Sequence, residues 1–190
     1  MLRHLFLGVF LIIQNLSFTQ DLREEQDTLN LEFKSGTLLS SKSFAPFYLV
    51  NNQYGEVDGD TPVFLKGEVE YKKSLNKNWR FLSGLGFRNE RFSEFYVGAK
   101  FKDWEFTVGR AKRTYGGLPS GLSSGSLAMS ENALPLPMIE PSLNEFKSVP
   151  FTHGYLKFRG SLRQSWMEED RYISKALLHG KTFYGMADLD

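Results

Sequence analysis

The sequence has no cysteine, little proline and no strong excess of charge of either sign. Its 190 residues include seven Pro and no Cys, and the formal net charge is +1 at pH 7. Without cysteine there is neither a disulfide framework nor a thiolate metal site. The balanced charge, with no basic stripe, argues against a nucleic-acid partner. The length allows one domain of ordinary size.

Long hydrophobic runs are also lacking, except at the start of the chain. The run Leu5–Ile13 follows a short basic start and is far shorter than the ~20 residues that a helix needs to cross a bilayer. After this run, the small residues Ser17 and Thr19 flank Phe18, as a signal peptidase requires. We therefore predict a secretory signal peptide over residues 1–19, cleavage between Thr19 and Gln20, and an exported chain of residues 20–190.

Aromatic residues and glycine, in contrast, are abundant. Aromatic residues make up 15% of the chain, and Phe and Gly each occur 17 times, a composition that favours β-sheet over helix. Apolar and polar residues alternate, which places them on opposite faces of a strand. The alternating segments are 29–34, 63–72, 79–88, 94–101 and 104–109. Polar breaks at Asn76–Asn78 and Lys102-Asp103 separate some of these segments, so residues 63–110 predict a meander of four antiparallel strands.

The polar face of these segments repeatedly carries full charges, as at Lys66, Glu68 and Glu70. The other face is aliphatic or aromatic, with aromatic residues such as Trp79 and Trp104 near the strand ends. A transmembrane β-barrel has this pattern, because its outer band is apolar and its lumen is polar. A soluble β-sandwich also alternates, so the pattern alone leaves both folds open. We predict an all-β protein, an antiparallel transmembrane β-barrel.

Several short motifs between residues 44 and 184 match a known family. They are Pro46–Gly55, Gly109-Arg110, Tyr115-Gly116-Gly117, the stretch Ser-x-Asn-Ala-x-Pro-x-Pro at Ser130–Pro137, Val149-Pro150-Phe151 and Ala176–Lys181. Together they resemble the Wzi-type capsule assembly proteins of Gram-negative bacteria, in the form common among Bacteroidetes. In that resemblance Pro46–Gly55 corresponds to the first barrel strand.

The resemblance implies an outer-membrane barrel of about eighteen strands that acts as a surface lectin. Its partners would be capsular or exopolysaccharide, outer-membrane lipid and the barrel assembly machinery, and no cofactor is implied. At about ten residues per strand plus turns, residues 20–190 supply only about six to eight strands. We therefore expect the chain to form the N-terminal part of such a barrel.

Saccharide binding requires aromatic faces and polar side chains, and an acidic polysaccharide also favours Arg and Lys. Residues of these types end the last strand of the meander and open a Gly-, Pro- and Ser-rich loop predicted over 114–150. The candidate saccharide-binding residues are Arg110, Lys112, Arg113, Tyr115 and, in the family motif, Asn132. The alternatives are a solvated strand end for the first four and a turn-fixing role for Asn132.

Catalysis and metal binding have little support in the sequence. No nucleophile elbow surrounds the loop serines, and neither His153 nor His179 has a recognisable catalytic partner. Glu56, Asp58 and Asp60 do not form a calcium loop, because Pro62 stands where a ligand is needed. We predict that the protein is not an enzyme and binds no metal. The rival functions are a structural or pore-forming barrel without lectin activity and a soluble exported β-sandwich that binds a ligand.

Cell fractionation tests the predicted location. An antibody raised against residues 114–150 should detect a heat-modifiable band in the outer-membrane fraction. The band should be larger than the 21.8 kDa of this chain, because the barrel needs more strands than the chain supplies. A band of the chain's own size in the periplasmic or secreted fraction would favour the soluble sandwich.

Overall fold

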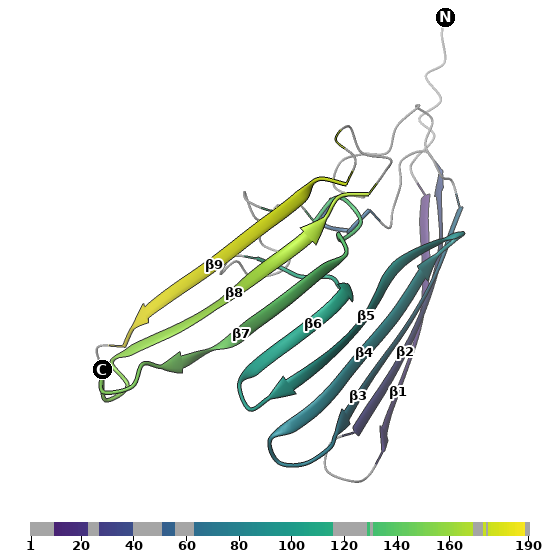
Figure 1. The fold of residues 1–190 in the computed structure, drawn as a ribbon. Helices are drawn as coiled ribbons and strands as arrows, with labels where there is room; N and C mark the ends of the chain where they lie inside the picture. The colour runs from purple at the N-terminus through teal and green to yellow at the C-terminus, as the bar shows by residue number, and fades with distance from the viewer. Residues whose placement is uncertain are drawn as a thin grey trace, which may run out of the picture.

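The computed structural model describes residues 10–22, 27–39, 51–55, 63–115, 129, 131–168, 173 and 175–188. These residues form a single curved antiparallel sheet in which every strand pairs with its neighbour in the sequence (Figure 1). The strands are β1 (Phe10–Leu22), β2 (Asp27–Leu39), β3 (Val63–Ser74), β4 (Trp79–Arg88), β5 (Arg91–Phe101), β6 (Trp104–Arg110), β7 (Met138–Ser148), β8 (Leu156–Trp166) and β9 (Leu177–Ala187). The predicted all-β antiparallel fold is therefore confirmed, with β1 and β9 at the two edges of the described sheet. Within the described ranges, no helix is both long and apolar enough to cross a membrane.

The connections between strands are short at one end of the sheet, and three of those at the other end are long (Figure 1). The turn edge holds the β3–β4, β5–β6 and β7–β8 turns. The loop edge holds the long β2–β3, β6–β7 and β8–β9 connections together with the two-residue β4–β5 turn. Lys102, in the two-residue β5–β6 turn, has a φ of 54°, in the left-handed region that tight hairpins use. Outer-membrane barrels have short turns on the periplasmic side and longer loops on the extracellular side. By this rule the turn edge corresponds to the periplasmic side.

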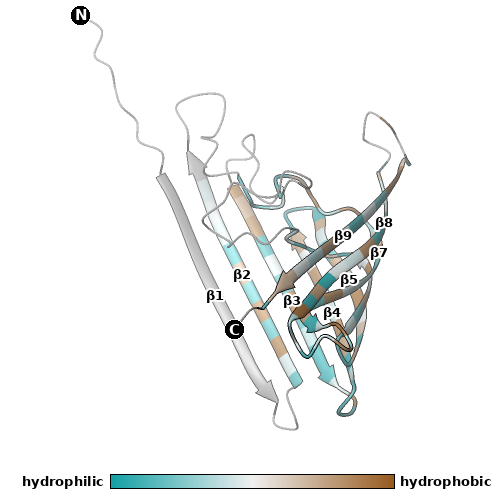
Figure 2. Cartoon of the chain, turned by 90° about the vertical axis from the view of Figure 1, so that its left-hand side faces the viewer, coloured by the Kyte–Doolittle hydropathy of each residue, from teal (hydrophilic) through white to brown (hydrophobic). Residues whose placement is uncertain are grey.

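The two faces of the sheet differ in polarity, and the colours alternate along the strands in Figure 2. The outer face carries apolar side chains that are about half exposed, among them Leu85 (48%), Val97 (52%) and Val108 (49%). The inner face carries charged side chains that are partly or fully buried, such as Lys66 and Glu140. The predicted alternation is confirmed, and the sheet has the sidedness that a barrel wall in lipid requires.

A glycine on the inner face makes room for a tyrosine ring. Gly84 on β4 lies directly opposite Tyr96 on β5, and a Cβ at Gly84 would lie 2.2 Å from Tyr96 Cε1. The bare glycine therefore lets the ring lie flat over the neighbouring strand. The Tyr96 hydroxyl then donates a hydrogen bond of 3.0 Å to Glu70 Oε1 on β3. Three consecutive strands are thus tied together on the inner face.

Two sequence-based assignments are corrected by the structure. The predicted loop 114–150 is too long, because its part from Met138 to Ser148 is strand β7. The loop was predicted from its Gly, Pro and Ser content, and proline lacks the N–H donor that a strand uses. The strand nevertheless continues through it, with Pro141 opposite Phe106. Residues 51–55, expected in a barrel strand, form a turn with positive φ at Asn52, Tyr54 and Gly55, and residues 46–50 lie outside the described ranges.

Strand β1 coincides with the second half of the predicted signal peptide. Its backbone pairs with β2 from Phe10 opposite Leu39 to Leu22 opposite Asp27. Cleavage before Gln20 stays a prediction. It would remove all of β1 except Gln20–Leu22 and leave β2 as the edge strand of the described sheet.

Replacing an outer-face valine by arginine tests whether that face contacts lipid. Val97→Arg, in the middle of β5, should lower the free energy of unfolding in bilayers by about 2–4 kcal/mol, because a guanidinium at mid-membrane depth loses its hydration. Val63→Arg, at the first residue of β3, should cost only about 0–1 kcal/mol. Urea titration of the folded fraction, followed by heat-modifiable gel mobility, measures both. Equal losses at the two depths would contradict a membrane-spanning wall.

Candidate functional site

The charged side chains of the inner face neutralise one another in pairs. Lys66 Nζ lies 3.1 Å from Glu68 Oε2 on the same strand. Glu70 accepts a 2.9 Å bond from Lys72 Nζ and a 3.2 Å bond from Asn30 Nδ2 on β2. Removing a charge from water costs free energy unless the charge is paired and hydrogen-bonded. This pairing therefore lowers the cost of placing charges on the inner face.

After β6 the chain turns back over this face with residues 111–115. Lys112 contacts the carboxylate of Glu68 and lies 3.7 Å from Glu94 Oε2, and its backbone N–H donates a 3.2 Å bond to Glu94 Oε1. The segment is therefore fixed against β3 and β5. This position carries Arg113 and Tyr115 onto the inner face of β6, β7 and β8.

Arg113 lies among acceptors from two strands. Its Nη2 donates to Glu105 Oε1 (2.5 Å) and to Thr107 Oγ1 (2.7 Å) on β6, and its Nε lies 3.5 Å from Glu140 Oε1 on β7. Burial alone would lower the pKa of the guanidinium, but the carboxylates of Glu105 and Glu140 more than offset it, and the pKa is raised. Arg113 is therefore a fixed cation in the site.

Tyr115 extends the same cluster toward β8. Its hydroxyl donates to Glu140 Oε2, and Glu140 is only 1% exposed. Burial, together with the negative charge of Glu140, raises the pKa of Tyr115, so the hydroxyl stays protonated and acts as a donor. The guanidinium carbon of Arg163 lies 4.3 Å from the centre of the Tyr115 ring. The cluster thus presents a cation stacked on an aromatic face.

Arg159 and Arg163 differ from the other cations of the cluster. Both lie on β8, and each contacts aromatic rings: Arg163 lies over Tyr115, and the guanidinium of Arg159 lies 4.8 Å from the ring of Phe146 and 4.9 Å from that of Tyr184. Among the described residues, no carboxylate lies within 4 Å of either guanidinium, and the Nε of each is buried without a hydrogen-bond acceptor. These two arginines therefore retain donors and charge that a ligand can use.

Two cavities adjoin this group. One, of about 70 Å³, has a mixed polar and apolar wall that includes Arg113, Tyr115, Glu140, Arg159, Ser161, Thr182 and Tyr184. The other, of about 240 Å³, is bordered by Arg113, Tyr115 and Arg163 together with apolar residues of the β6–β7 connection such as Leu134 and Met138. Arg113 and Tyr115 form the wall between the two cavities. The arrangement offers planar cations, hydroxyl groups and aromatic rings to one ligand.

The five predicted saccharide-binding residues are not brought together as one rim. Arg113 and Tyr115 belong to the cluster, whereas Lys112 is paired with Glu68 and Glu94 nearby. Arg110 pairs with Glu168 and lies 5.6 Å from the ring of Phe95, which is an outer-face residue.

Asn132 lies in the connection above the sheet and helps to fix a turn. Its Oδ1 accepts a 2.8 Å bond from the backbone N–H of Asn52. The turn 51–55 is held further by a 3.0 Å bond between the hydroxyls of Tyr54 and Thr114, and Arg88 donates a 2.7 Å bond to the carbonyl of Gly55. Asn132 of the family motif thus attaches the β6–β7 connection to the β2–β3 connection at the loop edge.

The sequence pattern did not identify Glu140, Arg159 or Arg163 as site residues. Glu140 lies in strand β7, which the sequence pattern placed in the loop 114–150. Its side chain was therefore not assigned to either face of the sheet. Arg159 and Arg163 lie four residues apart on β8, so their side chains share one face of the strand. Leu156 and Leu162 lie on the opposite face. That alternation was the available signal, but the rings that contact the two arginines come from other segments.

Metal binding finds no support among the described residues, where no three His, Asp or Glu side chains converge. Glu56, Asp58 and Asp60 lie outside the described ranges. His153 lies in the β7–β8 turn, and His179 Nδ1 lies 3.2 Å from Gln164 Oε1, so the two histidines are not part of the cluster. The absence of catalysis and of a metal remains a prediction.

A protein-family model matches most of the chain. The model of a family described as Capsule assembly protein Wzi matches residues 24–184. No curated protein and no solved structure matches the chain. The matched range begins after the predicted cleavage site and contains the whole cluster.

Removing the acceptor that joins Arg113 to Tyr115 tests the cluster's contribution to stability. Glu140→Gln should lower the free energy of unfolding by about 2–4 kcal/mol, because it leaves a buried guanidinium with one carboxylate fewer. The matched control is Glu145→Gln on the same strand, whose side chain is 63% exposed and should change stability little. Urea midpoints of both variants measure the difference. Equal midpoints for the two variants would show that the cluster contributes nothing to stability.

Proposed function

Because the chain belongs to the Wzi capsule assembly protein family, we propose that it is an outer-membrane lectin that holds capsular or exopolysaccharide at the cell surface. The family assigns the chain a role in capsule assembly and is a family of outer-membrane proteins. Direct saccharide binding is the step that this proposal adds. The binding site that we assign is the group Arg113, Tyr115, Arg159, Arg163 and Tyr184.

The observation that carries the proposal is the state of Arg159 and Arg163. The other cations of the cluster contact carboxylates, but these two contact rings and keep unused donors beside cavities. A guanidinium binds carboxylate or paired hydroxyl oxygens through parallel hydrogen bonds. The hydroxyls of Ser161 and Thr182, which bond each other at 2.9 Å, lie in the wall of the 70 Å³ cavity beside Arg159. Such a set suits a sugar unit, which presents several hydroxyls and, in an acidic polysaccharide, a carboxylate.

The position of the cluster also supports the proposal. The wall of the larger cavity includes Tyr54, Ala133 and Leu134, which belong to the long connections at the loop edge. In outer-membrane barrels the long loops lie on the extracellular side. A polysaccharide outside the cell would therefore approach the cluster past these connections.

Replacing Arg159 tests the proposal without removing the partner of a carboxylate in the described part of the chain. Arg159→Gln should weaken binding of purified capsular polysaccharide by about tenfold, the loss expected for one charge-assisted bidentate contact. Arg159→Lys should recover only part of the affinity, because an ammonium lacks the planar fork. Biolayer interferometry on detergent-solubilised protein measures binding, and antibody staining measures cell-bound capsule.

The matched control is Lys157→Gln on the same strand. Lys157 is paired with Asp188 at 2.6 Å and borders neither cavity, so its loss should leave binding unchanged. Wild-type protein that retains no polysaccharide but conducts ions in planar bilayers would favour the pore-forming alternative. Equal binding by wild type and Arg159→Gln would remove Arg159 from the site.

A further inference from the structure

The inner face of β8 carries a short repeat of side chains. Alternate residues of a strand share a face, and on this face the order is arginine, serine, arginine, serine: Arg159, Ser161, Arg163 and Ser165. We call Arg159 and Ser161 the first pair and Arg163 and Ser165 the second pair. Four residues of a strand span about 13 Å, so the two pairs follow each other along β8 at about that distance. A line of repeated donors suits a ligand that is itself a repeating chain.

The first pair borders the cavity of about 70 Å³. The guanidinium of Arg159 contacts the rings of Phe146 and Tyr184, and its Nε has no acceptor among the described residues. Ser161 Oγ and Thr182 Oγ1 lie 2.9 Å apart and share one hydroxyl hydrogen. Because two hydroxyls carry two hydrogens, the other one remains as a donor. The first pair therefore offers a cation and a hydroxyl donor to a ligand.

The second pair borders the cavity of about 240 Å³. Arg163 is only 8% exposed and lies opposite Gly180 on β9, where a Cβ would approach Arg163 Nη2 to 3.1 Å. The bare glycine therefore leaves room for the guanidinium. Ser165 is fully buried, and the residues opposite it on β7 and β9 are the apolar Met138 and Leu178. In the described part of the chain, neither Arg163 Nε nor Ser165 Oγ has a hydrogen-bond partner, and a ligand acceptor would remove that cost.

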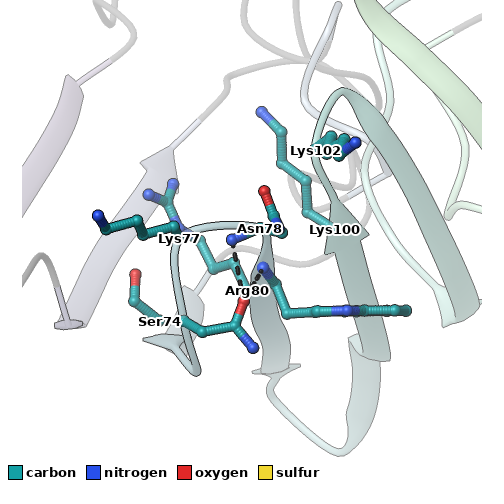
Figure 3. Close-up of a pocket in the computed structure, with 8 residues that line it drawn as sticks. Ser74, Lys77, Asn78, Arg80, Lys100 and Lys102 are labelled. Carbon is teal, nitrogen blue, oxygen red and sulfur yellow. Dashed lines mark hydrogen bonds between the residues drawn. The ribbon is translucent and has the colours of Figure 1, made fainter.

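The cations at the turn edge differ from these arginines. Figure 3 shows several of them around a cavity of about 400 Å³. Lys100 in its wall lies 3.7 Å from a carboxylate oxygen of Glu145, and Lys77 and Lys102 are exposed to water. These ammonium groups therefore already have a carboxylate or water as a partner. The buried donors of β8 gain more from a ligand.

The two pairs of β8 are separated too widely for one acidic sugar unit. Arg113 and Tyr115 lie between the two cavities, and the pairs repeat at about 13 Å along the strand. A sugar unit with one carboxylate can bind one guanidinium in the bidentate manner. Two acidic units of one chain can bind both, and the second unit then binds at a high effective concentration. The repeat therefore favours a polymer that lies parallel to β8.

We propose that the site binds two carboxylate-bearing sugar units of one polysaccharide chain, which lies along the inner face of β8. This inference rests on the proposed function and adds the class of ligand, an acidic polysaccharide whose carboxylates recur about 13 Å apart. One carboxylate binds Arg159 beside the hydroxyl donor of the first pair. The next binds Arg163 and Ser165, which lie nearer the loop edge.

Isothermal titration calorimetry on detergent-solubilised protein tests the proposal, with sized fragments of the host's capsular polysaccharide as probes. Wild-type protein should bind two fragments that carry one carboxylate each, but only one fragment that carries two. The longer fragment should bind about 100-fold more tightly, because its second carboxylate binds within the same complex. Chemical reduction of the carboxylates to alcohols should abolish this advantage of the longer fragment.

Substitution of the two arginines assigns the subsites. Arg159→Gln and Arg163→Gln should each weaken binding of the longer fragment by about tenfold, and together by about 100-fold, because the arginines contact different sugar units. Each single substitution should also leave one strong site for the shorter fragment instead of two. The matched control is Lys157→Gln, which removes a cation from the same face of β8 that is paired with Asp188. It should change neither affinity nor stoichiometry.

The outcomes separate this inference from the proposed function. A single site for the shorter fragment, or equal affinity for both fragment lengths, would overturn the two-unit arrangement and leave saccharide binding intact. Carboxyl-reduced polysaccharide that binds as tightly as the native form would overturn the acidic ligand class. Wild-type protein that binds neither the fragments nor the intact polysaccharide would overturn both proposals together. Heat-modifiable mobility of every variant verifies that it is folded, so loss of binding is not confused with loss of structure.

Discussion

A membrane wall that is one sheet thick has to keep all its charges on one face and neutralise them there. In this protein the strand repeat of two separates Val97 and Val108 on the outside from Glu94 and Thr107 on the inside. The inner charges are then paired across strands, as in the bonds that Glu70 accepts from Asn30 and Tyr96. The register of the sheet depends on this pairing, because a shift by one residue would turn the charges toward lipid.

The segment 111–115 depends on the same pairing. Lys112 enters the inner face because Glu68 and Glu94 are available to it, and Arg113 because Glu105 and Glu140 are. Once the segment is fixed, Tyr115 separates two cavities and forms a platform for Arg163. The candidate saccharide site is thus a consequence of charge neutralisation in the wall, completed by two arginines that the wall itself does not neutralise.

Local pattern was enough to predict the meander of residues 63–110, since alternation and two-residue turns are properties of adjacent residues. It failed at β7, where Pro141 lies inside a strand, and at Asn51–Gly55, whose turn is fixed by contacts with Asn132 and Arg88 far along the chain. The site was predicted only in part for the same reason. Arg113 and Tyr115 follow a strand end that the alternation pattern predicts. The suitability of Arg159 for ligand binding depends instead on the rings of Phe146 and Tyr184 and on the absence of a nearby described carboxylate.

Positive charge is tolerated in two different ways on the described sheet. On β8, aromatic rings shield Arg159 and Arg163, and they lower the cost of burying a cation without neutralising it. At the turn edge, Lys77 and Lys102 are exposed, so water solvates their charges. A ligand gains more at the first place than at the second, because a hydrated ammonium already has hydrogen-bond partners and the buried Nε atoms of the two arginines do not. An anionic ligand is therefore expected at the two arginines of β8.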